Sequence, residues 1–216
     1  MRELAQTRVL KFAAGAALAS AILCLPRLVL WTNREHPVWY LDAVIFTGGF
    51  VLWAFVFAWH TKYTGRPVFT LNISARDLTI ATGAGIGVAI AFRVFLDPLA
   101  RQAIPQDYPL NLEEWLAMYL FTLSLSQLLV VFAPFAWLMR LSKSRTIAFA
   151  LTVLFGLVVL AIKLRLVRPP ISPLLFSALF VARLIVAALS LAIYLRGGVL
   201  LTWWLGFLIH LRSLPI

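Results

Sequence analysis

Long runs of apolar residues, separated by short polar segments, dominate the chain. A run of about 18 or more apolar residues can cross a hydrocarbon core about 30 Å thick as a helix. The runs of this kind lie near residues 9–30, 40–60, 78–96, 112–141, 146–166 and 171–195, and a shorter seventh candidate lies at 197–211. Backbone groups in lipid must form their hydrogen bonds within the protein, and runs of this length satisfy them as helices. The pattern therefore predicts an all-α fold, a polytopic transmembrane helical bundle of about seven spans.

The composition indicates the same environment. Hydrophobic residues make up 62% of the 216 residues and charged residues 12%, with a mean hydropathy of +0.95. So few polar groups cannot cover a water-facing globule, which predicts an integral, multi-pass membrane protein. The loops are short and none resembles a linker. We therefore expect one membrane domain, composed of N-terminal helices (1–111) and a C-terminal helical core (112–216).

The beginning of the chain resembles a secretory signal, because Arg2, Arg8 and Lys11 precede or begin an apolar run. That run continues through Leu25, beyond the small residues at 17–21 where cleavage would occur. We therefore expect a retained first helix. Cys24 is the only cysteine, so no intramolecular disulfide can form, and we expect it to be a small buried apolar residue.

The formal net charge of +11 does not indicate nucleic acid as a partner. The basic residues gather at the ends of apolar runs, as in RLSKSR at 140–145 and KLRLVR at 163–168, where they would meet anionic lipid headgroups. With seven spans, Lys and Arg are slightly more numerous on the N-terminal side. This distribution favours a cytoplasmic N-terminus, and we expect a bacterial inner (plasma) membrane as the location.

Polar residues inside the apolar runs are the first functional candidates, because each must find a partner in the bundle or destabilise it. They are Arg93, Ser124, Ser126, Gln127, Arg183 and His210. Each also has a structural explanation. A serine hydroxyl can bond to its own helix, a glutamine can join two helices, and a residue near a span end can reach the interface.

Three segments of the C-terminal half share a layout with a known family. They are SQLLVVF at 126–132, ALTVLFGLVVL at 150–160 and IYLRGGVLLTWWLGFLIHLRSL at 193–214. In order and separation they resemble the CAAX prenyl protease and bacteriocin-processing (CPBP) family of intramembrane proteases, type II CAAX endopeptidase-like. That family carries EExxxR, FxxxH and HxxxN motifs on successive helices. The resemblance implies a CPBP-like core in residues 112–216.

The positions that would correspond to the family's catalytic motifs are mostly changed. Ser126 and Gln127 stand at the glutamates, Val131 at the arginine, Val159 at the first histidine and Leu214 at the asparagine, whereas Phe155 and His210 are kept. Neither an amide nor an unactivated hydroxyl can accept a proton near neutral pH. The resemblance therefore suggests a catalytically degenerate member, a pseudoprotease that binds, scaffolds or stabilises another membrane protein or complex.

Two other functions stay open at this stage. One is a divergent CPBP endopeptidase acting on prenylated or hydrophobic peptides, in which Ser126 and His210 would form a nucleophile and base. The other is a small subunit of a larger pigment or haem complex, with His60 or His210 as an axial ligand. His36, His60 and His210 come from separate segments without metal-binding spacing. We expect no metal and no cofactor, and the lipid bilayer and a membrane protein as the partners.

Overall fold

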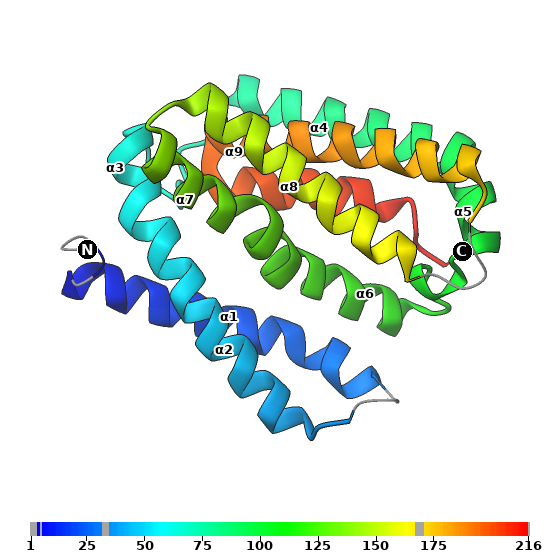
Figure 1. Cartoon of the computed structure of the whole chain (residues 1–216), viewed down its shortest axis with the longest axis horizontal. Coiled ribbons are helices and arrows are strands. Elements are labelled where there is room, and N and C mark those ends of the chain that lie inside the picture. Colours follow the sequence, from blue (N-terminus) through cyan, green and yellow to red (C-terminus); the bar gives the residue numbers. More distant parts are fainter. Residues whose placement is uncertain (1–3, 5, 32–34, 167–170, 216) are drawn as a thin grey trace. The chain divides into compact units, whose positions relative to one another are not determined.

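The chain is helical through most of the residues that the computed structural model describes, which are 4, 6–31, 35–166 and 171–215. Six helical stretches in this part of the chain are long and apolar enough to cross a membrane. They are Thr7–Leu30, Val38–Thr64, Ala75–Ala103, Leu112–Ser142, Arg145–Arg165 and Pro173–Leu211 (Figure 1). The predicted all-α, multi-pass membrane class is therefore confirmed. Arg2 and Arg168, used in the charge argument, lie outside the described residues.

Several stretches consist of consecutive elements. The first and fifth are single helices, α1 (Thr7–Leu30) and α8 (Arg145–Arg165). The second contains α2 (Val38–Phe55), η1 (Val56–His60) and α3 (Thr61–Thr64). The third contains α4 (Ala75–Ala91), η2 (Phe92–Leu96) and α5 (Asp97–Ala103), and η3 (Pro105–Asp107) follows it. The fourth contains α6 (Leu112–Phe121), η4 (Thr122–Ser126), η5 (Leu128–Phe132) and α7 (Ala133–Ser142), and the sixth is α9 (Pro173–Leu211).

The elements η1, η2, η4 and η5 are π-helical turns within the apolar stretches. A π-helical turn accommodates an extra residue and shifts the side chains that follow, and such turns are frequent at functional sites. Two of them, η4 and η5, lie directly before and after Gln127. The hydrophobic pattern predicted the fourth span but contains no signal for these turns.

The stretch α9 is a hairpin of two helices, as the separate apolar runs at 171–195 and 197–211 predict. Gly197 and Gly198 are non-helical, and Gly198 has φ 68° and ψ −160°, a conformation open essentially to glycine alone. Ile193 packs with Ala81, near the start of α4. After the break, Trp204 donates from Nε1 to Thr82 at 2.9 Å, and the chain then runs in the same direction as α4, opposite to the first helix of the hairpin (Figure 1).

Contacts divide the chain into two compact units. Unit 1 comprises Met1–Val68 and Glu113–Ala148, and unit 2 comprises Phe69–Leu112 and Phe149–Ile216. Each unit therefore combines segments from both halves of the sequence. The expected grouping into N-terminal helices (1–111) and a C-terminal helical core (112–216) stays a prediction.

Small residues allow close helix packing within each unit. In unit 1, α1 packs along α2, where a Cβ on Gly49 would lie 3.8 Å from Ala17 Cβ. In unit 2, α4 packs against α9, and a Cβ on Gly85 would lie only 2.8 Å from Leu208 Cβ. Large apolar side chains elsewhere are exposed, for example Phe95 at 76%, as lipid-facing residues are.

Candidate functional site

Ser124, the most buried polar residue of the fourth span, forms hydrogen bonds inside unit 1. Its side chain is fully buried and its hydroxyl donates to the Leu120 carbonyl at 2.7 Å. Cys24 Sγ lies 3.2 Å from the same hydroxyl oxygen. Because the serine proton is already donated to Leu120, the thiol is the donor in this contact. The pair joins α1 to η4 inside unit 1, and Cys24 is buried as predicted.

Ser126 is the last residue of η4, close to this contact, and Gln127 lies between η4 and η5. Both side chains are half-buried. The Gln127 Oε1 atom is buried and accepts no hydrogen bond from the residues that the structure describes. Val131, one helical turn further on, is buried at 7% exposure. This part of the span is thus neutral, with one buried amide oxygen that lacks a donor.

The remaining positions taken from the resemblance belong to unit 2. Phe155 and Val159 lie on α8 with 42% and 36% of their surface exposed, so they are not part of the buried core of that unit. His210, at the end of α9, and Leu214, just beyond it, are half-buried. Ser126, Gln127 and Val131 belong to unit 1. The structure therefore divides these positions between the two units.

Arg183 lies near the middle of the first helix of the α9 hairpin. It shares a helical face with Ser190 and Tyr194, which are 6% and 1% exposed. The outward face of the same helix carries exposed residues such as Val181 and Ile185. Arg183 is half-buried, and among the described residues it makes no hydrogen bond or ion pair. The sequence indicates that it should meet a polar partner, and the described part of the chain does not supply one.

His60 is buried at 1% exposure in η1, so it occupies a core position of unit 1. Its ring centroid lies 6.4 Å from that of Phe135, and its carbonyl accepts from the Thr64 hydroxyl at 2.7 Å. Across the described ranges, no group of three or more His, Cys, Asp or Glu side chains could hold a metal ion. His60 belongs to unit 1 and His210 to unit 2.

A group that sequence reasoning missed lies where the third span and the α9 hairpin end. Asp97 is 2% exposed, forms an ion pair with Arg212, and accepts from the Tyr108 hydroxyl at 2.8 Å. Arg93 donates from Nη1 to the Arg212 carbonyl at 2.8 Å. The guanidinium of Arg101 lies 5.1 Å from the centre of the Tyr108 ring. We refer to these five residues as the Asp97 cluster.

Burial shifts the pKa values of two groups of this cluster that lie outside the spans, Tyr108 and Arg212. It raises the pKa of Tyr108 to about 12, so the phenol keeps the proton that it donates to Asp97. Burial, and then the like charge of Arg93, lower the pKa of Arg212 to about 10, so its guanidinium is still charged at neutral pH. The Arg212 side chain also lies over the Phe92 ring, 5.2 Å from its centre.

The sequence contains a signal for this cluster, in the stretch FLDPLARQ at 95–102. Asp97 and Pro98 begin α5, where an acidic first turn and an early proline are favourable. The burial of Asp97 depends on Arg212, which is more than one hundred residues away in the sequence. The sequence therefore shows only that two opposite charges, Asp97 and Arg212, lie at the ends of two apolar runs.

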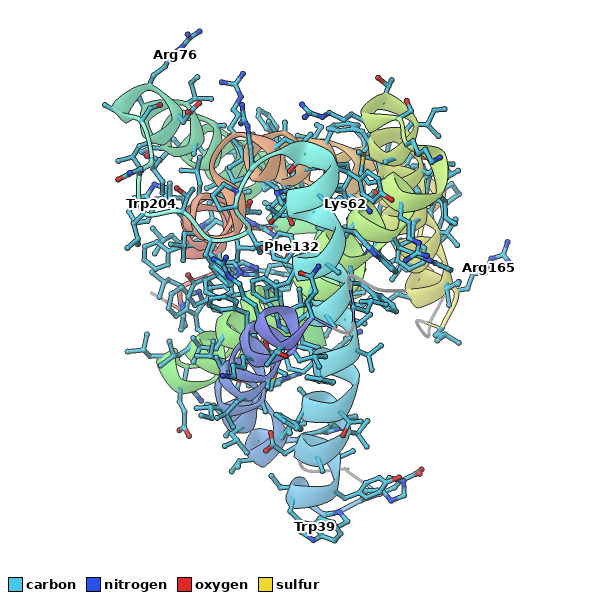
Figure 2. The ribbon with its side chains drawn as sticks, turned by 90° about the vertical axis from the view of Figure 1, so that its left-hand side faces the viewer. Trp39, Lys62, Arg76, Phe132, Arg165 and Trp204 are labelled. Atoms are coloured by element: carbon cyan, nitrogen blue, oxygen red, sulfur yellow. The ribbon has the colours of Figure 1, made fainter. Side chains whose placement is uncertain are left out.

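Most of the described basic residues of unit 1 lie at one end, whereas Arg27, in the last turn of α1, lies at the other end. Arg145 donates from Nη2 to the Thr64 carbonyl at 2.8 Å, and Arg140 lies over the Trp59 ring, 4.5 Å from its centre. The described cations at this end are Arg8, Lys11, Lys62, Arg66, Arg140, Lys143 and Arg145. The described carboxylates of the unit are all at the other end, namely Glu35, Asp42, Glu113 and Glu114. Figure 2 shows Lys62 and Trp39 at the opposite ends of the second span.

No family model, no curated protein and no solved structure matches this chain. The fold and its polar groups define a class, a multi-pass α-helical membrane protein. Its charged residues are concentrated at the ends of the spans, and neutral residues occupy the polar centre of the fourth span.

Proposed function

We propose that this chain is a non-catalytic membrane protein of CPBP-like architecture that binds or stabilises another membrane protein. The observation that carries the proposal is the chemistry of Ser126, Gln127, Val131 and Val159. At the positions where the resemblance expects two acids, a cation and an imidazole, all four side chains are neutral. None of them can act as a general base at neutral pH without further activation.

The acids and the arginine of the family's motif are replaced together by neutral residues, and this joint replacement supports the same proposal. A protein that kept the arginine beside a neutral pair would leave a buried charge without its partner, a situation that costs about 3 to 5 kcal/mol in buried ion pairs. Val131, at the position of the arginine, is buried and apolar. A fold can persist after its chemistry has been lost, because packing and catalysis depend on different residues.

The C-terminal segment supports the architectural part of the proposal. The resemblance rests there on a tyrosine, a glycine pair and a final histidine. Tyr194 is 1% exposed, Gly197 and Gly198 form the bend, and His210 lies at the end of the second helix. The buried tyrosine, the glycine bend and the terminal histidine thus all belong to one helical hairpin, which fits the packed helical core that the resemblance implies.

The charge distribution of unit 1 supports a cytoplasmic N-terminus. Lys and Arg are enriched in the cytoplasmic segments of membrane proteins, and acidic residues have little influence on orientation. The cationic end of unit 1 includes the start of α1 and the turn between α7 and α8. We therefore propose that this end faces the cytoplasm, in a bacterial inner membrane.

The test is gentle purification of the wild type beside Ser126→Ala and Gln127→Ala. We expect a membrane protein to co-purify in a fixed ratio, and both variants to retain that ratio, because neither side chain performs chemistry. Gln127→Ala removes only a half-buried amide, so its folded yield should be close to that of the wild type. A monodisperse chain that is purified alone and has peptidase activity would overturn the proposal.

A further inference from the structure

The Asp97 cluster contains more cations than anions. Arg93 and Arg101 are exposed, whereas Asp97 is 2% exposed and its charge is paired with Arg212. The next carboxylate along the chain, Asp107, has its own partner, since Lys163 Nζ lies 2.5 Å from its Oδ2. The cluster therefore has an excess of positive charge among the described residues.

Most of the donors of the two exposed arginines are unused. A guanidinium has five N–H donors in a planar fork. Arg93 uses Nη1 for the Arg212 carbonyl, and Arg101 contacts the Tyr108 ring through its face. Within the part of the chain that the structure describes, neither side chain has a carboxylate partner. Both can still donate to an anion.

The position of the cluster is that of the membrane interface. Arg93 lies in η2, near the end of the apolar run at 78–96, and Arg212 directly follows the last residue of α9. Exposed apolar side chains flank Arg93 on the same segment, with Val94 at 57% and Phe95 at 76% exposure. Such residues face lipid tails, and the long side chain of Arg93 can extend from this level toward the headgroups.

We propose that Arg93 and Arg101, supported by Arg212, bind the phosphate of an anionic phospholipid at this end of unit 2. Arginine suits this ligand because its planar fork can donate two parallel hydrogen bonds to phosphate oxygens. Basic side chains near the ends of transmembrane helices can attract anionic lipid headgroups. Asp97 holds Arg212 in place, and the π-helical turn η2 presents Arg93 at the edge of the cluster.

A phospholipid can contact both the arginines and the exposed apolar side chains beside them, whereas free phosphate can contact only the arginines. Free phosphate would use the guanidinium donors but leave Val94 and Phe95 without a ligand contact. A phospholipid places its phosphate on the arginines and its acyl chains along these exposed apolar side chains. The site therefore predicts selectivity for the negatively charged headgroup together with a requirement for the lipid tails.

The experiment measures lipid binding to the purified full chain by native mass spectrometry. Phosphatidylglycerol, phosphatidylcholine with the same acyl chains, and inorganic phosphate are compared. We expect phosphatidylglycerol to bind at least tenfold more tightly than phosphatidylcholine, and inorganic phosphate not to displace it. Arg93→Gln should weaken phosphatidylglycerol binding about tenfold, as the loss of one charge-assisted hydrogen bond implies. Arg93→Lys should retain part of the affinity.

Two further variants keep the result interpretable. Arg101→Gln removes a cation whose contact within the described ranges is with the Tyr108 ring, so it tests the site even if Arg93→Gln disturbs the hydrogen bond to the Arg212 carbonyl. Arg76→Gln is the matched control, because Arg76 is an exposed arginine at the opposite end of the third span and points away from the helices (Figure 2). Equal binding of the two lipids, or unchanged affinity in folded Arg93→Gln and Arg101→Gln, would overturn the proposal. Displacement by inorganic phosphate would show that the site takes free phosphate instead of a lipid.

Discussion

Single arginines of unit 2 differ in what surrounds them. Arg212 is paired with a carboxylate that is almost fully buried, and its side chain is 21% exposed. Arg183 is half-buried in the middle of a span without a described partner. Removing one member of a buried pair leaves the other charge uncompensated, whereas removing an unpaired charge relieves a cost. The two residues should therefore respond in opposite ways to the same substitution.

Arg212→Leu should lower the free energy of unfolding by about 3 to 5 kcal/mol, because Asp97 would remain buried without its cation. Arg183→Leu should be neutral or stabilising, since an arginine at the centre of a span costs about 2.5 to 3.5 kcal/mol on insertion scales. Unfolding in mixed micelles at neutral pH measures both. A large loss of stability in Arg183→Leu would show that this side chain has a partner after all.

Tyr108 should ionise about two pH units above an ordinary tyrosine. Burial raises its pKa to about 12, so the folded state favours the protonated phenol. The resulting stabilisation is complete below about pH 10, the unfolded value, and is lost as the pH rises through 12. The difference in tyrosinate absorbance between wild type and Tyr108→Phe measures this midpoint. A midpoint near 10 in folded protein would contradict the burial of this residue.

At the scale of elements, the reversal at Gly197 and Gly198 converts one long helical stretch into a hairpin. Gly198 has a positive φ with an extended ψ, which a side chain makes unfavourable. A Cβ on Gly197 would lie 2.6 Å from Leu201 Cδ2, so that position is restricted by packing. The bend thus depends on both glycines, for different reasons.

Gly198→Ala should destabilise unit 2 by about 1 to 3 kcal/mol through backbone strain. Gly83→Ala is the matched control, because Gly83 lies inside α4 with open space around its Cα and alanine is the better helix former. Thermal unfolding followed by helical circular dichroism measures both variants. Equal stability of Gly198→Ala and wild type would show that residue 198 does not need this conformation.

The sequence predicted the helices well because a hydrophobic run is a local property. The break at Gly197 was visible as a glycine pair between two apolar runs, and the burial of Cys24 followed from its type. The π-helical turns around Gln127 were not predictable, because they depend on packing that inserts a residue without changing hydropathy. The Asp97 cluster was missed for a related reason, since Asp97 and Arg212 meet only after the chain has folded. The assignment of Ser126, Gln127 and His210 to an old active site stays a prediction.

At the scale of the whole molecule, the charge distribution predicts an orientation. The cationic end of unit 1, which includes Lys143 and Arg145, should face the cytoplasm. Single cysteines introduced at Lys143 and at Glu113, in a Cys24→Ala background, should react with an impermeant thiol reagent from opposite sides of the membrane. In intact cells only the cysteine at 113 should be labelled. Labelling of the cysteine at 143 instead would reverse the orientation.

The proposed loss of catalysis can be measured directly with a cleavage assay. Wild type, Gln127→Ala and His210→Ala would be incubated with hydrophobic and prenylated peptides, and the products followed by mass spectrometry. Our account predicts no turnover above the background of empty micelles for any of the three, because the two acids, the cation and the first histidine of the family's motifs are replaced by Ser126, Gln127, Val131 and Val159. Turnover by the wild type that disappears in both variants would show instead that the chain is a working peptidase with an unfamiliar set of residues.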